Sequence, residues 1–154
     1  MKQRWLPVGL LALAIFVVNA LARFISWKAG VENPDAQSRL GLIGVIVVGL
    51  LVMAAAIRWS IRYPFPRVFG DMCVAIVTGT LLSVILGPFA GGQKPFAEGV
   101  EFFVYELMLF IAIGAVAALL GFVIVTALGK DWKSRGLKRF EQRYNRRPRR
   151  AVGG

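Results

Sequence analysis

Histidine is absent from this chain of 154 residues, and cysteine occurs only once. Without histidine, the chain lacks the side chain that most often acts as a general base or binds a metal near neutral pH. The single cysteine, Cys73, lies in an apolar stretch, where a thiol is inert, and it has no second cysteine for a disulfide. The sequence also has no phosphate-binding loop, nucleophile elbow or paired-carboxylate metal motif. These absences predict a protein that is not an enzyme and that holds no cofactor or metal.

Apolar sequence is abundant: 57% of the residues are hydrophobic, and most of them fall in four long runs. The runs contain stretches of about 18 or more residues without a charge, long enough to cross the hydrocarbon core of a bilayer as a helix. We therefore predict an all-α fold, an integral membrane four-helix bundle with short loops. The expected spanning helices lie near residues 5–26, 39–60, 70–89 and 101–129 of a membrane domain at 1–129, and a basic tail occupies 130–154.

The first run has features of a secretory signal, because Lys2 and Arg4 precede it and Ala20-Leu21-Ala22 supplies small residues at a cleavage spacing. The run is longer than a usual signal core, however, and it continues past that site to Trp27. We expect it to be kept as the first spanning helix. Cleavage is the alternative, and it would leave three spans in the same orientation.

The chain has 19 Lys and Arg residues against 8 acidic ones, and their uneven placement predicts the orientation. Ten of the basic residues lie in 130–154, while Arg58, Arg62 and Arg67 lie between the second and third runs with no acid among them. Lys and Arg are retained on the cytoplasmic side of a membrane. With four spans, both termini then face the cytoplasm, and we predict a multi-pass protein of a bacterial plasma (inner) membrane.

Small residues recur at every fourth position along the third run, so they share one face of the predicted helix. Small side chains let two helix backbones approach closely, and such close packing drives helix association in lipid. We expect this stripe to pack inside the bundle; the alternative is that it faces a partner subunit. The second run has a shorter version of the pattern at Gly41, Val45 and Gly49. The stripe of the third run consists of Ala75, Gly79, Ser83 and Gly87.

Few ionisable side chains lie inside the runs, and each is a candidate functional residue because a charge in lipid is costly. Glu106 lies about one and a half helical turns into the fourth run, on the outer side in the predicted orientation. Asn19 and Arg23 of the first run lie at a similar depth. We expect Glu106 to pair with Arg23, with Asn19 as a second partner. The alternative is a proton- or cation-binding carboxylate in an outward-facing cavity.

Asp71 opens the third run on the predicted cytoplasmic side. An acid is favoured in the first turn of a helix, because the N–H groups there have no partner inside the helix. The neighbouring second loop is basic, so we expect an ion pair between Asp71 and Arg58, Arg62 or Arg67. Such a pair would be structural.

The tail combines its basic residues with apolar residues that fall near one side of a helix. A basic segment directly after a span is attracted to the anionic lipids of the inner leaflet, by about 1 kcal/mol per charge near the surface. We expect the tail to bind these lipids, although Gly136 weakens a continuous helix there. An acidic partner protein is the alternative, and nucleic acid is a weaker one. The apolar residues are Trp132, Leu137, Phe140 and Tyr144.

Two functions are consistent with these features. The first is a non-enzymatic accessory or scaffold subunit of a plasma-membrane complex, with other membrane subunits or further copies of the chain as partners. It is favoured by the packing stripe, the basic tail and the lack of a polar pathway. The second is a small transporter or lipid-carrier flippase, including an oligomeric one, with a polar site near Glu106.

Overall fold

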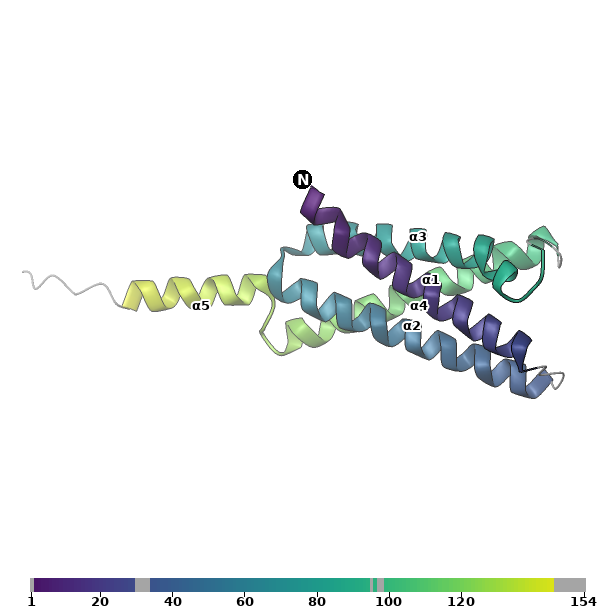
Figure 1. Cartoon of the computed structure of the whole chain (residues 1–154). Coiled ribbons are helices and arrows are strands. Elements are labelled where there is room, and N and C mark those ends of the chain that lie inside the picture. The colour runs from purple at the N-terminus through teal and green to yellow at the C-terminus, as the bar shows by residue number, and fades with distance from the viewer. Residues whose placement is uncertain (1, 30–33, 95, 97–98, 146–154) are drawn as a thin grey trace, which may run out of the picture.

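The computed structural model describes residues 2–29, 34–94, 96 and 99–145, and over these residues the fold is all-helical (Figure 1). Four helices, α1 to α4, are long and apolar enough to cross a membrane, as in a multi-pass membrane protein. A fifth, shorter helix follows them. The helices are α1 (Lys2–Lys28), α2 (Pro34–Arg62), α3 (Phe65–Ala90), α4 (Val100–Ala127) and α5 (Trp132–Asn145).

Two helices begin earlier than the sequence predicted. α2 begins at Pro34 and α3 at Phe65, each five residues before the expected start. Proline lacks a backbone N–H but fits the first turn of a helix, where that group has no partner inside the helix. Pro64 is accordingly the N-cap residue of α3, and Pro66 lies within the first turn. Prolines therefore mark the beginnings of α2 and α3.

The helices place specific segments at the two ends of the bundle (Figure 1). The start of α1, the short connection between α2 and α3, and α5 lie at one end, named here the tail end. The end of α1, the start of α2 and the connection between α3 and α4 lie at the other end, named the far end. Arg23, near the end of α1, and Glu106, near the start of α4, therefore both lie towards the far end.

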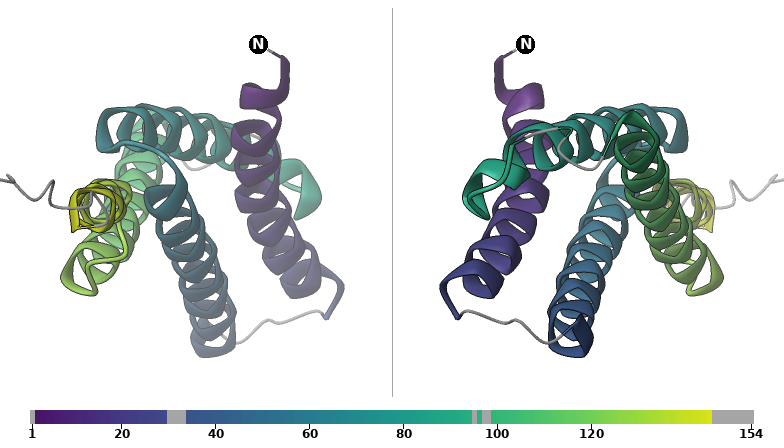
Figure 2. Two further views of the ribbon diagram at one scale, coloured as in Figure 1. Left: turned by 90° about the vertical axis from the view of Figure 1, so that its left-hand side faces the viewer. Right: turned by 90° about the vertical axis from the view of Figure 1, so that its right-hand side faces the viewer.

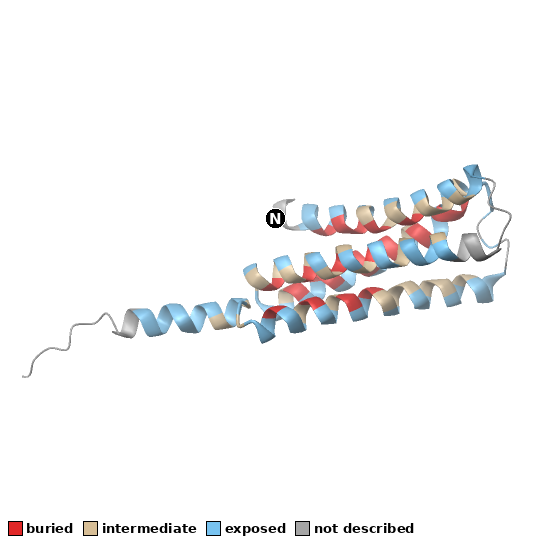
Figure 3. Cartoon of the chain, turned by 90° about the horizontal axis from the view of Figure 1, so that it is seen from below, coloured by how far each residue is buried: buried red, intermediate tan, exposed pale blue. Residues whose placement is uncertain are grey.

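The tightest helix pairs join helices that are not neighbours in the sequence, because α1 packs mainly on α3 and α2 mainly on α4. The helices cross obliquely, and α1, α2 and α4 fan out from the side that α3 occupies (Figure 1, Figure 2). Buried residues follow the facing sides of the helices, whereas the outward sides are exposed (Figure 3). The core includes Val8, Ile15, Val52, Met72 and Ile76.

The small-residue stripe of α3 is the surface on which α1 packs. All four of its residues are buried, and a Cβ added at Gly79 would lie 2.9 Å from the backbone oxygen of Ala12 on α1. Real Cβ atoms are not found at such distances, so a side chain at this position would force the helices apart. The hydroxyl of Ser83 donates a hydrogen bond of 2.8 Å to the carbonyl oxygen of Gly79, which satisfies it within its own helix.

The shorter small-residue pattern of α2 does not form the expected packing surface. A Cβ added at Gly41 or Gly49 would meet no atom within 4 Å. The close approach on α2 is made instead by Gly44, where a Cβ would lie 3.3 Å from that of Ala22 on α1. α4 packs on α2 through Gly121, whose Cβ would lie 2.7 Å from a backbone oxygen of α2. The face of α2 that carries Gly41 is thereby left open.

The tail begins with a helix, α5, which continues through Gly136. Asp131 lies just before it, and its Oδ2 accepts a hydrogen bond of 3.2 Å from the backbone N–H of Lys133. Hydrogen bonding from the side chain of Ser134, and from the backbone of Ser134 and Lys133, holds the pKa of the Asp131 carboxyl below its usual value of 3.8. The carboxylate therefore acts as a cap for the first turn of α5.

α5 extends away from the bundle at the tail end and is largely exposed (Figure 1, Figure 3). Its contact with the four long helices is slight and is made mainly to α2. Three large apolar side chains, those of Trp132, Leu137 and Phe140, are more than half exposed along it. The last basic residues of the tail, from 146 onward, lie outside the described residues.

Candidate functional site

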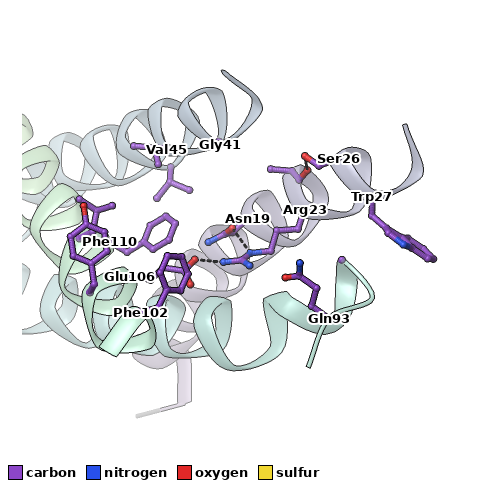
Figure 4. Close-up of a pocket in the computed structure, with 16 residues that line it drawn as sticks. Asn19, Arg23, Ser26, Trp27, Gly41, Val45, Gln93, Phe102, Glu106 and Phe110 are labelled. Carbon is purple, nitrogen blue, oxygen red and sulfur yellow. Dashed lines mark hydrogen bonds and ion pairs between the residues drawn. The ribbon is translucent and has the colours of Figure 1, made fainter. Parts of the chain in front are cut away.

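A cavity of about 570 Å³ lies between α1, α2 and α4 towards the far end of the bundle (Figure 4). The connection after α3 closes part of it through Gly91 and Gln93. Its volume falls within the range of roughly 300–1,000 Å³ that is typical of pockets for small molecules. Asn19, Arg23 and Glu106, which the sequence singled out separately, all line this cavity.

Arg23 of α1 and Glu106 of α4 form an ion pair at the cavity, in which Nη2 of Arg23 donates to Oε1 of Glu106. The two side chains are 25% and 15% exposed, respectively, so the pair is mostly shielded. The arginine passes α3 at Gly87, where a Cβ would lie 3.2 Å from Nε of Arg23. The last residue of the small-residue stripe thus leaves room for the arginine side chain that connects α1 to α4.

Asn19 lies one turn before Arg23 on the same face of α1, and it is 8% exposed. Its Oδ1 accepts a hydrogen bond of 3.4 Å from Nε of Arg23. Its amide nitrogen, Nδ2, is buried and has no hydrogen-bond partner among the described residues. A buried polar group without a partner costs about 1–3 kcal/mol, so the Asn19 nitrogen lowers the stability of the bundle at this position.

Aromatic side chains make up much of the remaining wall. Phe102 and Phe110 lie on the α4 side, across from Asn19 and Arg23 on α1 (Figure 4). Trp27 lies at the end of α1, and a Cβ at Gly92 would come within 3.2 Å of its indole nitrogen. Gly92 has φ 71°, a conformation that glycine adopts without strain, so the connection after α3 can lie against the indole.

Two features of the cavity were not predicted. Its α2 wall contains Gly41, Gly44, Val45 and Val48. Gly41 and Val45 were predicted only as part of a packing pattern, and Gly44 and Val48 were not singled out. The aromatic wall, which includes Trp27 and Phe102, was not predicted either. A signal that could have found the wall is the spacing of Phe102, Glu106 and Phe110, which puts the three on one face of α4.

Asp71 and Arg58 lie away from this cavity. Asp71 is buried on α3 at the tail end, and its Oδ2 lies 3.7 Å from Nε of Arg67, one turn earlier on the same helix. The guanidinium of Arg67 also lies over the ring of Tyr63, 4.0 Å from its centroid. Arg58 is exposed on α2. The geometry of Asp71 is therefore that of a local ion pair. The prediction that Asp71 lies in the first turn was wrong, because α3 begins at Phe65 and its first turn contains no acidic residue.

Over the part of the chain that the structure describes, the cavity wall combines one buried amide, one ion pair and aromatic side chains, an arrangement suited to binding a ligand. Among the described residues, no group of three or more Asp, Glu or Cys side chains is close enough together to hold a metal ion.

Comparison with known proteins gives no relative from which a role can be transferred. No family model matches the chain, no curated protein matches it in sequence, and no solved structure matches it in fold.

Proposed function

We propose that this chain is a small, non-enzymatic membrane protein that binds a polar ligand in the cavity near the far end, as a small transporter or lipid-carrier flippase would. The observation that carries the proposal is a cavity of ligand size whose wall includes three polar side chains from two helices, those of Asn19, Arg23 and Glu106. The lack of a polar pathway in the sequence favours the accessory role, whereas a cavity lined by polar side chains supports the transporter or flippase.

We also propose in which membrane the chain lies and how it is oriented there. The Lys and Arg excess of the second loop and of the tail favours a bacterial plasma membrane with both termini in the cytoplasm. The tail end of the bundle is then cytoplasmic, and the cavity opens near the outer leaflet. A ligand would enter from the outer leaflet or the external solution.

The orientation is tested by labelling single cysteines in intact cells after Cys73→Ala removes the natural thiol. Gln93→Cys, in the connection at the far end, is expected to react with a membrane-impermeant maleimide from outside. Ser134→Cys, in α5, is expected to react only after the cells are opened. The reverse pattern would overturn the orientation and place the cavity near the cytoplasm.

Filling the cavity tests the function. Gly41 lines the cavity and has open space around its Cβ direction, so Gly41→Phe is expected to occupy the cavity while the fold persists. Wild-type protein purified in mild detergent should retain a bound lipid or polar solute, detected by native mass spectrometry, and Gly41→Phe should lose it. Gly49→Phe is the matched control, because Gly49 is equally open on the same helix but does not line the cavity.

A second candidate, the accessory or scaffold subunit, is favoured by one observation: α5 exposes apolar side chains beside basic ones and barely contacts the bundle. An amphipathic basic helix of this kind lies on anionic inner-leaflet lipid, at about 1 kcal/mol per charge, or binds a partner subunit. We propose that α5 lies on the lipid surface. Binding of nucleic acid to α5 is disfavoured, because nearby lipid competes for the same basic side chains. Stable co-purification of another membrane protein, without a retained ligand, would support the accessory role instead.

A further inference from the structure

We infer that the ligand of the cavity is a membrane lipid, which binds with its headgroup at the mouth of the cavity and an acyl chain at the inner end. The inference rests on the proposed function and names its class of ligand. Three properties of the cavity lead to it: its depth in the membrane, the order of its lining from polar to apolar, and its open side.

The cavity runs along the helix axes from the far end to about the middle of the membrane. The far-end limits of the three spans around it are Lys28 on α1, Arg39 on α2 and Val100 on α4. On α4 the lining residues run from Phe102 to Phe110, which is ten residues inside that limit. Ten residues of helix rise about 15 Å, half the thickness of a hydrocarbon core of about 30 Å. The cavity therefore has the depth of one lipid leaflet.

The lining changes from polar to apolar with depth. Asn19 lies at the inner end, but its Oδ1 already accepts a bond from Arg23 and its Nδ2 is buried, so the inner end offers a ligand mainly apolar surface. A polar solute would leave its own groups without partners there, at a cost in free energy, whereas an acyl chain has none to satisfy. The mouth is lined by Ser26, Trp27 and Gln93, and the inner end by Val48, Leu109 and Phe110.

Arg23 and Glu106 lie between the mouth and the inner end, and their side chains keep 25% and 15% of their surface exposed. Among the described residues that line the cavity, they are the only charged ones, and their charges are opposite. A lipid without net charge therefore meets no unbalanced charge at this depth. The guanidinium has more N–H groups than its bonds to Glu106 and Asn19 use, and the ester oxygens between headgroup and chain are acceptors for them.

The cavity is open towards the membrane on its α4 side. Tyr105 and Leu109 line it, yet they are 64% and 42% exposed. α4 packs closely on α2 at Gly121, in the tail half, whereas the starts of the two helices lie apart at the far end (Figure 2). A lipid can therefore enter sideways from the leaflet at the far end, which is the outer leaflet in the proposed orientation, and its chain stays in an apolar environment throughout.

Photo-crosslinking in a bilayer tests the inference on the intact chain. The probe is phosphatidylcholine, whose headgroup has no net charge, with a diazirine in the middle of one acyl chain. A trace of it is mixed into phosphatidylcholine nanodiscs that hold the wild-type protein, and mass spectrometry maps the adducts after illumination. We expect adducts at Phe110 and Val48, besides those that surrounding lipid forms with outward-facing residues such as Leu21. Val48 is 3% exposed and lines the cavity, so a chain reaches it from inside.

Two variants link these adducts to the cavity. Gly41→Phe fills the mouth and is expected to lower the ratio of Phe110 adducts to Leu21 adducts at least fivefold. Gly49→Phe is the matched control on the same helix, away from the cavity, and is expected to leave the ratio unchanged. An unchanged ratio in Gly41→Phe, or adducts confined to outward-facing residues in the wild type, would overturn the inference.

The outcomes separate the inference from the proposed function. Retention of a water-soluble solute by the wild-type protein, lost in Gly41→Phe and without adducts at Phe110 or Val48, would reject the lipid and keep a polar-ligand cavity. Absence of both a retained ligand and these adducts would reject the inference together with the proposed function.

Discussion

Gly79→Leu is expected to destabilise the bundle more than any other single change to the small-residue stripe, by about 1–3 kcal/mol or enough to prevent folding. A Cβ at this position would lie 2.9 Å from the backbone oxygen of Ala12 and 3.0 Å from Cβ of Ile15. Both atoms are held close to the backbone of α1, so neither can rotate away. The two helices must separate, and the dispersion contacts along the whole α1–α3 crossing weaken. Thermal unfolding in detergent, followed by circular dichroism, measures the loss.

Two controls separate crowding from the general effect of a larger side chain in a membrane helix. Gly49→Leu adds the same atoms on α2, where a Cβ meets nothing within 4 Å, and it is expected to leave the melting temperature nearly unchanged. Ile85→Phe adds volume to an exposed position of α3 itself. Equal destabilisation by all three changes would show that the α1–α3 contact does not depend on the glycine.

The four long apolar helices could be predicted because hydrophobic length is a local property of the sequence. The length of a charge-free run shows whether it can cross the hydrocarbon core, independently of the rest of the sequence. The helix starts at Pro34 and Phe65 were missed because proline has two opposite effects, breaking a helix interior and fitting its first turn. Only the hydrogen bonds of the following residues decide between them, and the pattern of residue types does not record those bonds.

The packing faces could be predicted only in part. The stripe on α3 and the glycines of α2 have similar spacing, yet one is buried against α1 while Gly41 and Gly49 are open. Spacing shows which residues share a face, but the rotation of each helix in the bundle decides what that face meets. In α2 that rotation directs Gly44 towards α1 and leaves Gly41 beside the cavity.

The polar residues of the site could be predicted from the sequence, whereas its aromatic residues could not. Two opposite charges at similar depth in lipid lower their cost by meeting, which is why Arg23 and Glu106 could be paired from the sequence. Nothing comparable distinguishes Phe102 or Trp27 from the many apolar residues that contact lipid. Their role in the cavity depends on where α1, α2 and α4 diverge, which is a property of the whole bundle.

Removing either charge of the Arg23–Glu106 pair is expected to cost about 2–3 kcal/mol of stability. Breaking a fully buried pair costs about 3–5 kcal/mol, and this pair is 25% and 15% exposed, so its cost is somewhat lower. Glu106→Gln leaves the guanidinium of Arg23 without its counter-charge, and Arg23→Gln leaves the carboxylate likewise. Chemical denaturation in detergent, or thermal unfolding, measures each loss. Glu101→Gln is a matched control, because it removes an exposed carboxylate from the first turn of the same helix.

The double variant shows how the pair acts. In Arg23→Gln with Glu106→Gln, no charge is left without its partner, so the combined loss is expected to be smaller than the sum of the single losses by about 1–2 kcal/mol. The two glutamines can still bond to each other and to Asn19, which keeps α1 and α4 connected at the cavity. Ligand retention should then follow stability across the four proteins. A Glu106→Gln protein that is as stable as the wild type, yet retains no ligand and has lost a pH-dependent activity, would contradict this. Glu106 would then be a carboxylate that binds a proton or a cation, with Arg23 as its regulator and not as its structural partner.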